Sequence, residues 1–108
     1  MAQKVNIVVD QGTTFSTSFT FTDDADNPID FTSYTAASQM RKSYSSSTSY
    51  SFDVGLTSSG IITLGMSANT TTQITAGRYL YDLEVTDING VRSRLVEGIV
   101  TVTPEITR

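Results

Sequence analysis

Two carboxylates, Asp82 and Glu84, stand two residues apart in the stretch AGRYLYDLEVTDING, residues 76–90. Paired carboxylates can serve as general acid and general base. Period-two alternation places both side chains on one face of a strand, opposite a row of apolar side chains. Arg92 and Arg94 follow on the next predicted strand, where they can form cross-strand ion pairs with the two acids. An ion-paired, solvated face is the favoured interpretation, because short motifs often match by chance.

The acidic run DDADN, residues 23–27, is a second candidate site, because calcium prefers hard oxygen ligands. Its spacing differs from the D-x-D-x-D-G pattern of a calcium loop, and no glutamate follows at the bidentate position. Asp and Asn side chains also bond their own backbone in turns, and Pro28 follows directly. The sequence therefore predicts a plain β-turn and no metal site.

The side chains that most often do chemistry are missing from this chain. It has no histidine and no cysteine, which excludes imidazole and thiolate chemistry as well as disulfides. It has no G-x-S-x-G elbow, no P-loop and no G-x-G-x-x-G. We therefore expect no enzymatic activity and no cofactor.

Charge and hydropathy limit the partners. The net charge is −4, from 11 acidic and 7 basic residues, and an acidic surface repels phosphate backbones. We expect no signal peptide in the opening stretch MAQKVNIVVDQG, and no apolar run approaches the roughly 20 residues of a membrane span. We expect neither a nucleic-acid partner nor a membrane partner, and the absence of cysteine favours synthesis in a reducing cytoplasm.

Composition and patterning predict an all-β fold. The 108 residues suit one domain, residues 1–108, and 14 serines and 18 threonines favour turns and strands respectively. Apolar side chains alternate between clusters of turn residues, and helical periodicity is almost absent. Strands are predicted at 4–10, 13–22, 34–42, 50–54 and 58–67, then within the stretch 76–90 ahead of its closing hairpin, and last at 91–102.

The segments between these strands have predictions of their own. The Ser-rich stretch 43–50 is expected to be a flexible loop, and 67–77 is expected to hold one helical turn capped by Ser67 or Asn69. Asn89-Gly90 predicts a tight hairpin, because both residues tolerate positive φ. Gly98 is expected to mark a β-bulge in the long last strand.

Seven short strands in about 100 residues fit an Ig-like antiparallel β-sandwich. Tyr79 stands near the start of the sixth strand, where Ig-like domains carry a tyrosine corner, and Tyr81 falls on the position of the second cysteine of antibody domains. Gly77 lets the chain turn sharply into this strand. A seven-stranded barrel and a jelly-roll fragment are the alternatives.

Three stretches carry a resemblance to a known family: PIDFTSYTAASQMRK at 28–42, AGRYLYDLEV at 76–85 and LVEGIVTVTPEITR at 95–108. With the Gly-Thr-Thr-Phe of residues 12–15, their order resembles that of small Ig-like modules of tailed-phage virions, such as the N-terminal domains of phage baseplate upper proteins. Three positions depart from the family pattern. Phe31 takes the usual place of Leu, Ser33 that of Gly, and Ala76 that of Pro.

The resemblance implies a structural role in the virion after synthesis in the host cytoplasm, in the tail, baseplate or neck. It implies docking to other virion proteins, with a homo-oligomer in the particle as a further option. Because a baseplate upper protein continues beyond such a domain, the 108-residue chain is expected to be a standalone module. The alternatives are a capsid decoration protein and a carbohydrate-binding or host-adhesion module, although the chain has no tryptophan for a sugar platform.

Two segments are predicted to dock. The N-terminal strand begins only three residues into the chain and can present backbone groups to a neighbour. The Ser-rich loop carries Tyr44 and Tyr50, a residue type enriched at interfaces. The alternative for these tyrosines is that Tyr50 begins a core strand and Tyr44 covers a sheet edge. The predicted contact residues are Val5, Ile7, Val8, Val9, Tyr44 and Tyr50.

Overall fold

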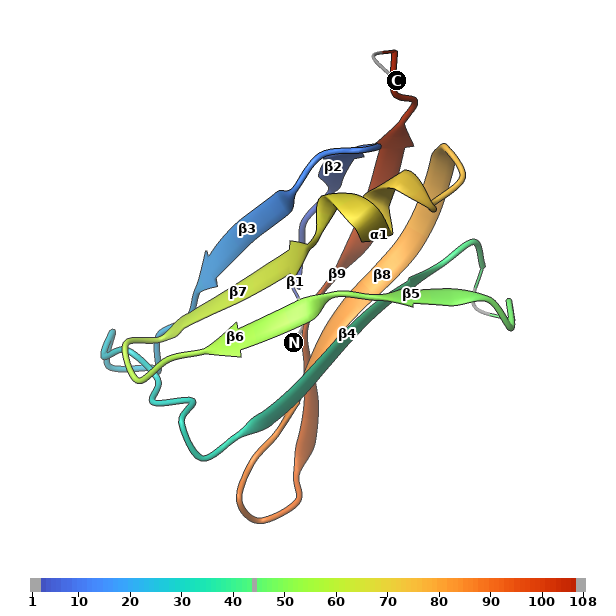
Figure 1. The fold of residues 1–108 in the computed structure, drawn as a ribbon. Coiled ribbons are helices and arrows are strands. Elements are labelled where there is room, and N and C mark those ends of the chain that lie inside the picture. Colours follow the sequence, from blue (N-terminus) through green and yellow to red (C-terminus); the bar gives the residue numbers. More distant parts are fainter. Residues whose placement is uncertain (1–2, 44, 107–108) are drawn as a thin grey trace.

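The computed structural model describes residues 3–43 and 45–106, which form two β-sheets packed face to face (Figure 1). Within these residues the elements, in chain order, are β1 Gln3–Lys4, β2 Ile7–Asp10, β3 Phe15–Thr20, β4 Thr35–Arg41, β5 Ser49–Ser51, β6 Asp53–Leu56, β7 Ile61–Met66, α1 Ala68–Thr72, β8 Gly77–Thr86 and β9 Arg92–Thr103. The prediction of an all-β sandwich is confirmed.

The larger sheet has the order β1-β9-β8-β4-β5, with β2 also pairing with β9, and the smaller sheet has the order β3-β7-β6. β1 and β2 run parallel to β9, and every other strand pair is antiparallel. The larger sheet is therefore mixed and not purely antiparallel. β2 runs the same way as β9 and finishes at the end of the sandwich where the chain turns into β3 (Figure 1).

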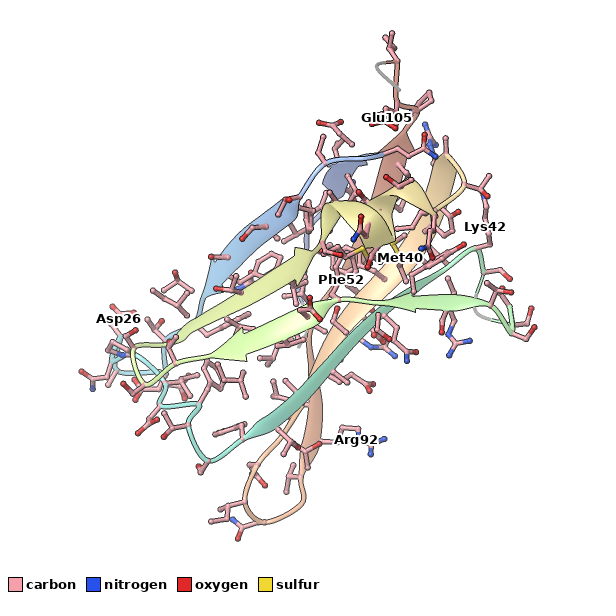
Figure 2. The ribbon with its side chains drawn as sticks, viewed as in Figure 1. Asp26, Met40, Lys42, Phe52, Arg92 and Glu105 are labelled. Atoms are coloured by element: carbon pink, nitrogen blue, oxygen red, sulfur yellow. The ribbon has the colours of Figure 1, made fainter. Side chains whose placement is uncertain are left out.

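The core lies between the inner faces of the two sheets. Along β8 the side chains of Tyr79, Tyr81, Leu83 and Val85 are buried, as their alternation predicts. Ile62, Leu64 and Met66 of β7 oppose them from the smaller sheet. Met40 and Phe52 lie in the middle of this layer (Figure 2).

The predicted strand 50–54 is divided between the two sheets. β5 pairs with β4 of the larger sheet, while β6 pairs with β7 of the smaller sheet. Phe52 stands at the crossing, where its backbone N–H donates to the Ser38 carbonyl at 2.9 Å and its side chain is buried. The crossing divides the predicted strand 50–54 into β5 and β6, and a break at residues 5–6 divides the predicted strand 4–10 into β1 and β2. The structure therefore has more strands than the seven predicted.

The tyrosine corner has the predicted geometry. The Tyr79 hydroxyl donates to the Thr75 carbonyl at 2.6 Å, and the ring is 4 % exposed. Gly77 has φ of +143°, which a residue with a Cβ rarely adopts, so glycine is needed for the turn into β8. Ser67 caps α1, as predicted, with its hydroxyl oxygen accepting from the Thr70 N–H.

The DDADN run and the Asn89-Gly90 hairpin form the same turn. In each, an aspartate (Asp23 or Asp87) accepts two backbone N–H bonds on its carboxylate, at 2.9–3.0 Å. In each, the fourth residue has positive φ: 63° at Asp26 and 83° at Gly90. Asn89 does not have positive φ, contrary to the prediction, because three loop residues ending in a left-handed residue satisfy the hairpin.

Asp26 therefore occupies a position that suits glycine (Figure 2). We expect Asp26→Gly to raise the free energy of unfolding by about 0.5–1 kcal/mol, since the relief of left-handed strain exceeds the entropy that glycine adds to the unfolded chain. Urea unfolding measures the change. The reciprocal variant Gly90→Asp should lower the free energy of unfolding by a similar amount. No atom lies within 4 Å of the position of a Cβ at residue 90, so the loss would come from backbone strain and not from a clash. Equal stability of all three proteins would contradict the assignment of strain.

The bulge in β9 lies at Leu95 and not at Gly98. Leu83 pairs with Val96 but Glu84 pairs with Arg94, so Leu95 has no partner on β8. Gly98 keeps regular pairing with Tyr81. It serves a different purpose, because a Cβ at residue 98 would overlap the Val5 carbonyl. The glycine thus permits the close approach of the N-terminal segment to β9.

Candidate functional site

The outer face of the larger sheet holds the candidate carboxylates in a shallow groove of about 390 Å³. β8 contributes Asp82 and Glu84, and β9 contributes Arg94 and Glu97. The polar lining is completed from β1, β4 and the segments that follow them, by Lys4, Asn6, Gln39, Arg41 and Ser43. The groove therefore mixes both signs of charge over four adjacent strands.

Arg94 is the centre of an ion-pair network. Its Nε lies 3.3 Å from Asp82 Oδ2, and its Nη1 lies 3.1 Å from Glu97 Oε2. Arg94 thus pairs with Asp82 as predicted, although Glu84 is its direct neighbour across the strands. Arg92 instead faces Thr86 and makes no ion pair with any described residue, so the predicted pairing fails for it. In Figure 2 it lies near the far end of the sheet, towards the 87–90 hairpin.

Glu97 is the member of this network that sequence reasoning missed. It stands directly across from Asp82, so the two carboxylates lie side by side on β8 and β9. The bulge at Leu95 shifts the residue opposite each β8 position from Gly77 to Leu83, so counting from the hairpin without the bulge gives the wrong partner for Asp82. The sequence did carry a signal for Glu97. Val96 and Val100 are four residues apart and face inward, so alternation along the strand points Glu97 outward.

The pKa values of this cluster follow from its crowding. Burial raises the pKa of Asp82, the Glu84 carboxylate adds to the rise, and the Arg94 guanidinium opposes it. The hydrogen bond to Glu97 raises the pKa of Arg94, and Asp82 adds to that rise. A raised carboxyl pKa is typical of general acids, but here the ion pair with Arg94 engages Asp82. Within residues 3–43 and 45–106, no group of three or more His, Cys, Asp or Glu side chains could hold a metal.

The predicted N-terminal docking segment is largely engaged with the chain's own β9. The Val5 N–H donates to the Glu97 carbonyl at 3.0 Å, and the Val5 carbonyl accepts from the Tyr81 hydroxyl at 2.6 Å. Between β1 and β2, the side-chain oxygen of Asn6 accepts a hydrogen bond from the Ile99 N–H of β9 at 3.1 Å, in the place of a backbone carbonyl.

The side chains of this segment divide between core and solvent. Val9 is fully buried, while Val5 and Ile7 are half-buried against the core. Val8 is 59 % exposed and is the apolar side chain of β2 that projects outward. It shares the outer sheet face with Ile99, which is 37 % exposed.

The two predicted loop tyrosines differ. Tyr44 lies outside the described residues. Tyr50 packs edge-to-face on the Tyr79 ring, at 6.0 Å between centroids, and is half-buried against the core. The structure therefore supports the alternative that Tyr50 begins a core strand. Further exposed apolar side chains lie at Ile88 and Val91, in and beside the β8–β9 hairpin, which sequence reasoning did not assign to docking.

The buried hydroxyl of Tyr81 gives a testable pH dependence. Burial raises its pKa to about 12, above the ordinary tyrosine value of about 10. A raised pKa in the folded state means that the stability from the neutral hydroxyl is complete below pH 10 and is lost as pH rises towards 12. We expect the free energy of unfolding to fall over this window. Tyr81→Phe should show a shallower fall, and identical slopes would contradict the burial of this proton.

Comparisons with known proteins add little to this geometry. No protein-family model matches the chain, and no curated protein matches it. Among solved structures, a family 123 glycoside hydrolase from Clostridium perfringens aligns over 97 % of this chain and 23 % of its own, at 14 % identity and a TM-score of 0.39. A likeness at that level carries no argument about activity. In the part of the chain that the structure describes, no helix is long and apolar enough to cross a membrane.

Proposed function

We propose that this chain is a structural protein of a tailed-phage virion that acts by docking to other virion proteins in the tail, baseplate or neck. The observation that carries the proposal is the placement of the residues behind the family resemblance. Phe31 is buried, Asp30 accepts the Thr32 N–H and hydroxyl at 3.0 and 2.6 Å, and Tyr79 forms the corner. The shared motifs therefore fall at positions that specify the fold.

The Gly-Thr-Thr-Phe motif supports the same proposal. The Gly12 N–H donates to the buried Thr71 hydroxyl at 3.1 Å, and that hydroxyl donates to the Thr13 carbonyl at 2.7 Å. Gln11 extends this network, because it donates to the Ile74 carbonyl and accepts from the Glu105 N–H. The motif thus joins the first turn, α1 and the C-terminal segment at one end of the sandwich.

Several polar side chains of the groove favour docking over catalysis, because they are paired with one another or with the backbone. Arg94 pairs with two carboxylates, and Arg41 donates to the Ser46 carbonyl and to the Gln39 side chain. Groups engaged in this way are satisfied within the chain and leave a surface of mixed charge. Exposed apolar side chains accompany the pattern: Val8 and Ile99 on the sheet face, and Ile88 and Val91 at the hairpin. We propose these four side chains as contact residues; Val8 is the member that belongs to the predicted N-terminal segment.

The test is the location of the protein in purified particles. Head and tail fractions of the phage that encodes the chain are analysed by quantitative mass spectrometry, and density for the sandwich is sought by electron microscopy. The proposal expects the protein in the tail fraction at a fixed copy number per particle. Recovery only with heads would favour a decoration protein. Absence from washed particles, with binding on a glycan array, would overturn the proposal in favour of an adhesion module.

A further inference from the structure

The free edge of the smaller sheet is the feature that none of the preceding functions uses. β3 is the end strand in the order β3-β7-β6, and six of its residues pair with β7 in unbroken register. The Phe21 N–H donates to the Gly60 carbonyl, which continues this ladder. Because hydrogen bonding alternates along an antiparallel strand, the backbone groups of Ser16, Ser18 and Thr20 point to the free side.

β3 lacks the features that normally protect a sheet edge. Its sequence, FSTSFT, has no charge, no proline and no glycine, and its register shows no bulge. The other described edges are protected. β6 carries Asp53 and Gly55, β5 has three residues, and the β1–β2 edge carries Lys4 and Asp10. β3 is therefore the edge most open to another strand.

The sequence of this edge is a palindrome about Thr17: Phe15-Ser16-Thr17-Ser18-Phe19. In an antiparallel pair of two copies centred on Thr17, each Phe15 faces Phe19 of the second copy, and each Ser16 faces Ser18. The Ser16–Ser18 pairs are those whose backbone groups point outward, so they exchange hydrogen bonds across the junction. No like charges meet.

The inner face of such a pair gains apolar contact. Phe15 and Phe19 are half-buried at the rim of the core, where Phe15 packs on Phe52 at 5.8 Å and Phe19 on Phe21 at 6.5 Å between ring centroids. In the dimer, Phe15 of one copy lies opposite Phe19 of the other on each side of Thr17, and these pairs cover the parts of both rings that are exposed in a single copy. We infer that two copies of this chain associate through β3, so that the two small sheets become one continuous sheet.

The main experiment introduces charge along the edge and measures the mass of the protein in solution by analytical ultracentrifugation from micromolar to millimolar concentration. Wild type should dimerise. S16K/S18K and S16E/S18E each place like charges opposite one another twice, and dimerisation should weaken by about tenfold or more. Their mixture should form a heterodimer. S16K/S18E is the matched control, because its opposite charges face each other in this register and it should dimerise at least as well as wild type.

Cysteine cross-linking tests the register, since the chain has no cysteine of its own. Thr17→Cys lies on the two-fold axis in a non-hydrogen-bonded pair, where Cα atoms are about 4.5 Å apart, so it should form a disulfide dimer. Ser18→Cys, one residue off the axis, should not. Disulfide formation by Ser18→Cys alone would overturn the pairing about Thr17.

Other outcomes also overturn the inference. A wild-type protein that is monomeric at millimolar concentration, with β3 amides protected from exchange only in particles, would assign the edge to a strand of a different protein. Dimers that form equally in all three charge variants would place the contact elsewhere. The inference does not rest on the virion proposal, so the fractionation and the ultracentrifugation can fail separately.

Discussion

Phe31→Ala should destabilise the protein by about 3–5 kcal/mol, a large share of the 5–15 kcal/mol typical of a domain. The Phe31 side chain is 1 % exposed and is held on two sides by aromatic rings. Its ring lies 5.9 Å from Phe21 and 5.1 Å from Tyr34, edge-to-face in both pairs. The backbone is fixed as well, because the Phe31 N–H donates to the Thr57 carbonyl. Alanine would therefore leave a cavity between the rings of Phe21 and Tyr34 and remove both edge-to-face contacts.

The matched control is Phe31→Leu, which installs the residue usual in the resembling phage modules. It removes less volume, and we expect a loss of about 1–1.5 kcal/mol. Urea unfolding of the two variants and wild type gives the comparison. A loss below 1 kcal/mol for Phe31→Ala would mean that this aromatic cluster is not part of the cooperative core.

The features predictable from sequence were those fixed by neighbouring residues. The alternation in β8, the Gly77-x-Tyr79 corner and the Ser67 cap each depend on residues within one turn or one strand. The turn at DDADN was predictable for the same reason, since Asp23 bonds to backbone groups only two and four residues away. Such features depend on interactions between residues close in sequence and need no contact with distant parts of the chain.

The features missed depend on packing between distant segments. The chain changes sheets at Phe52 because its side chain fits the core beside Tyr81, at 6.1 Å between centroids, and no local signal marks this fit. The position of the bulge at Leu95 is set by the pairing of β8 with β9 as a whole. For the candidate site, the common face of Asp82 and Glu84 was predictable, but the addition of Glu97 required the true register.

Gly98 shows how a distant contact can reverse a local preference, and Gly98→Ala should lower the free energy of unfolding by about 1–3 kcal/mol. Within a strand, alanine is ordinarily the more stabilising residue by about 0.5–1 kcal/mol. Here the added methyl group would meet the Val5 carbonyl, which receives the Tyr81 hydroxyl. The N-terminal segment must move away, and this buried hydrogen bond is then lost or lengthened.

Gly55→Ala is the control for this last prediction. Gly55 also lies in a strand, but the nearest atom to a Cβ built there is 3.8 Å away, an ordinary contact. We expect Gly55→Ala to stabilise by up to about 0.5–1 kcal/mol, so the two substitutions should have opposite signs. Hydrogen exchange separates the causes further, because only Gly98→Ala should speed exchange of the Val5 and Ile99 amides, which are bonded to Glu97 and Asn6. Unchanged exchange at both amides in a stable Gly98→Ala protein would show that β9 does not need a glycine to hold the N-terminal segment.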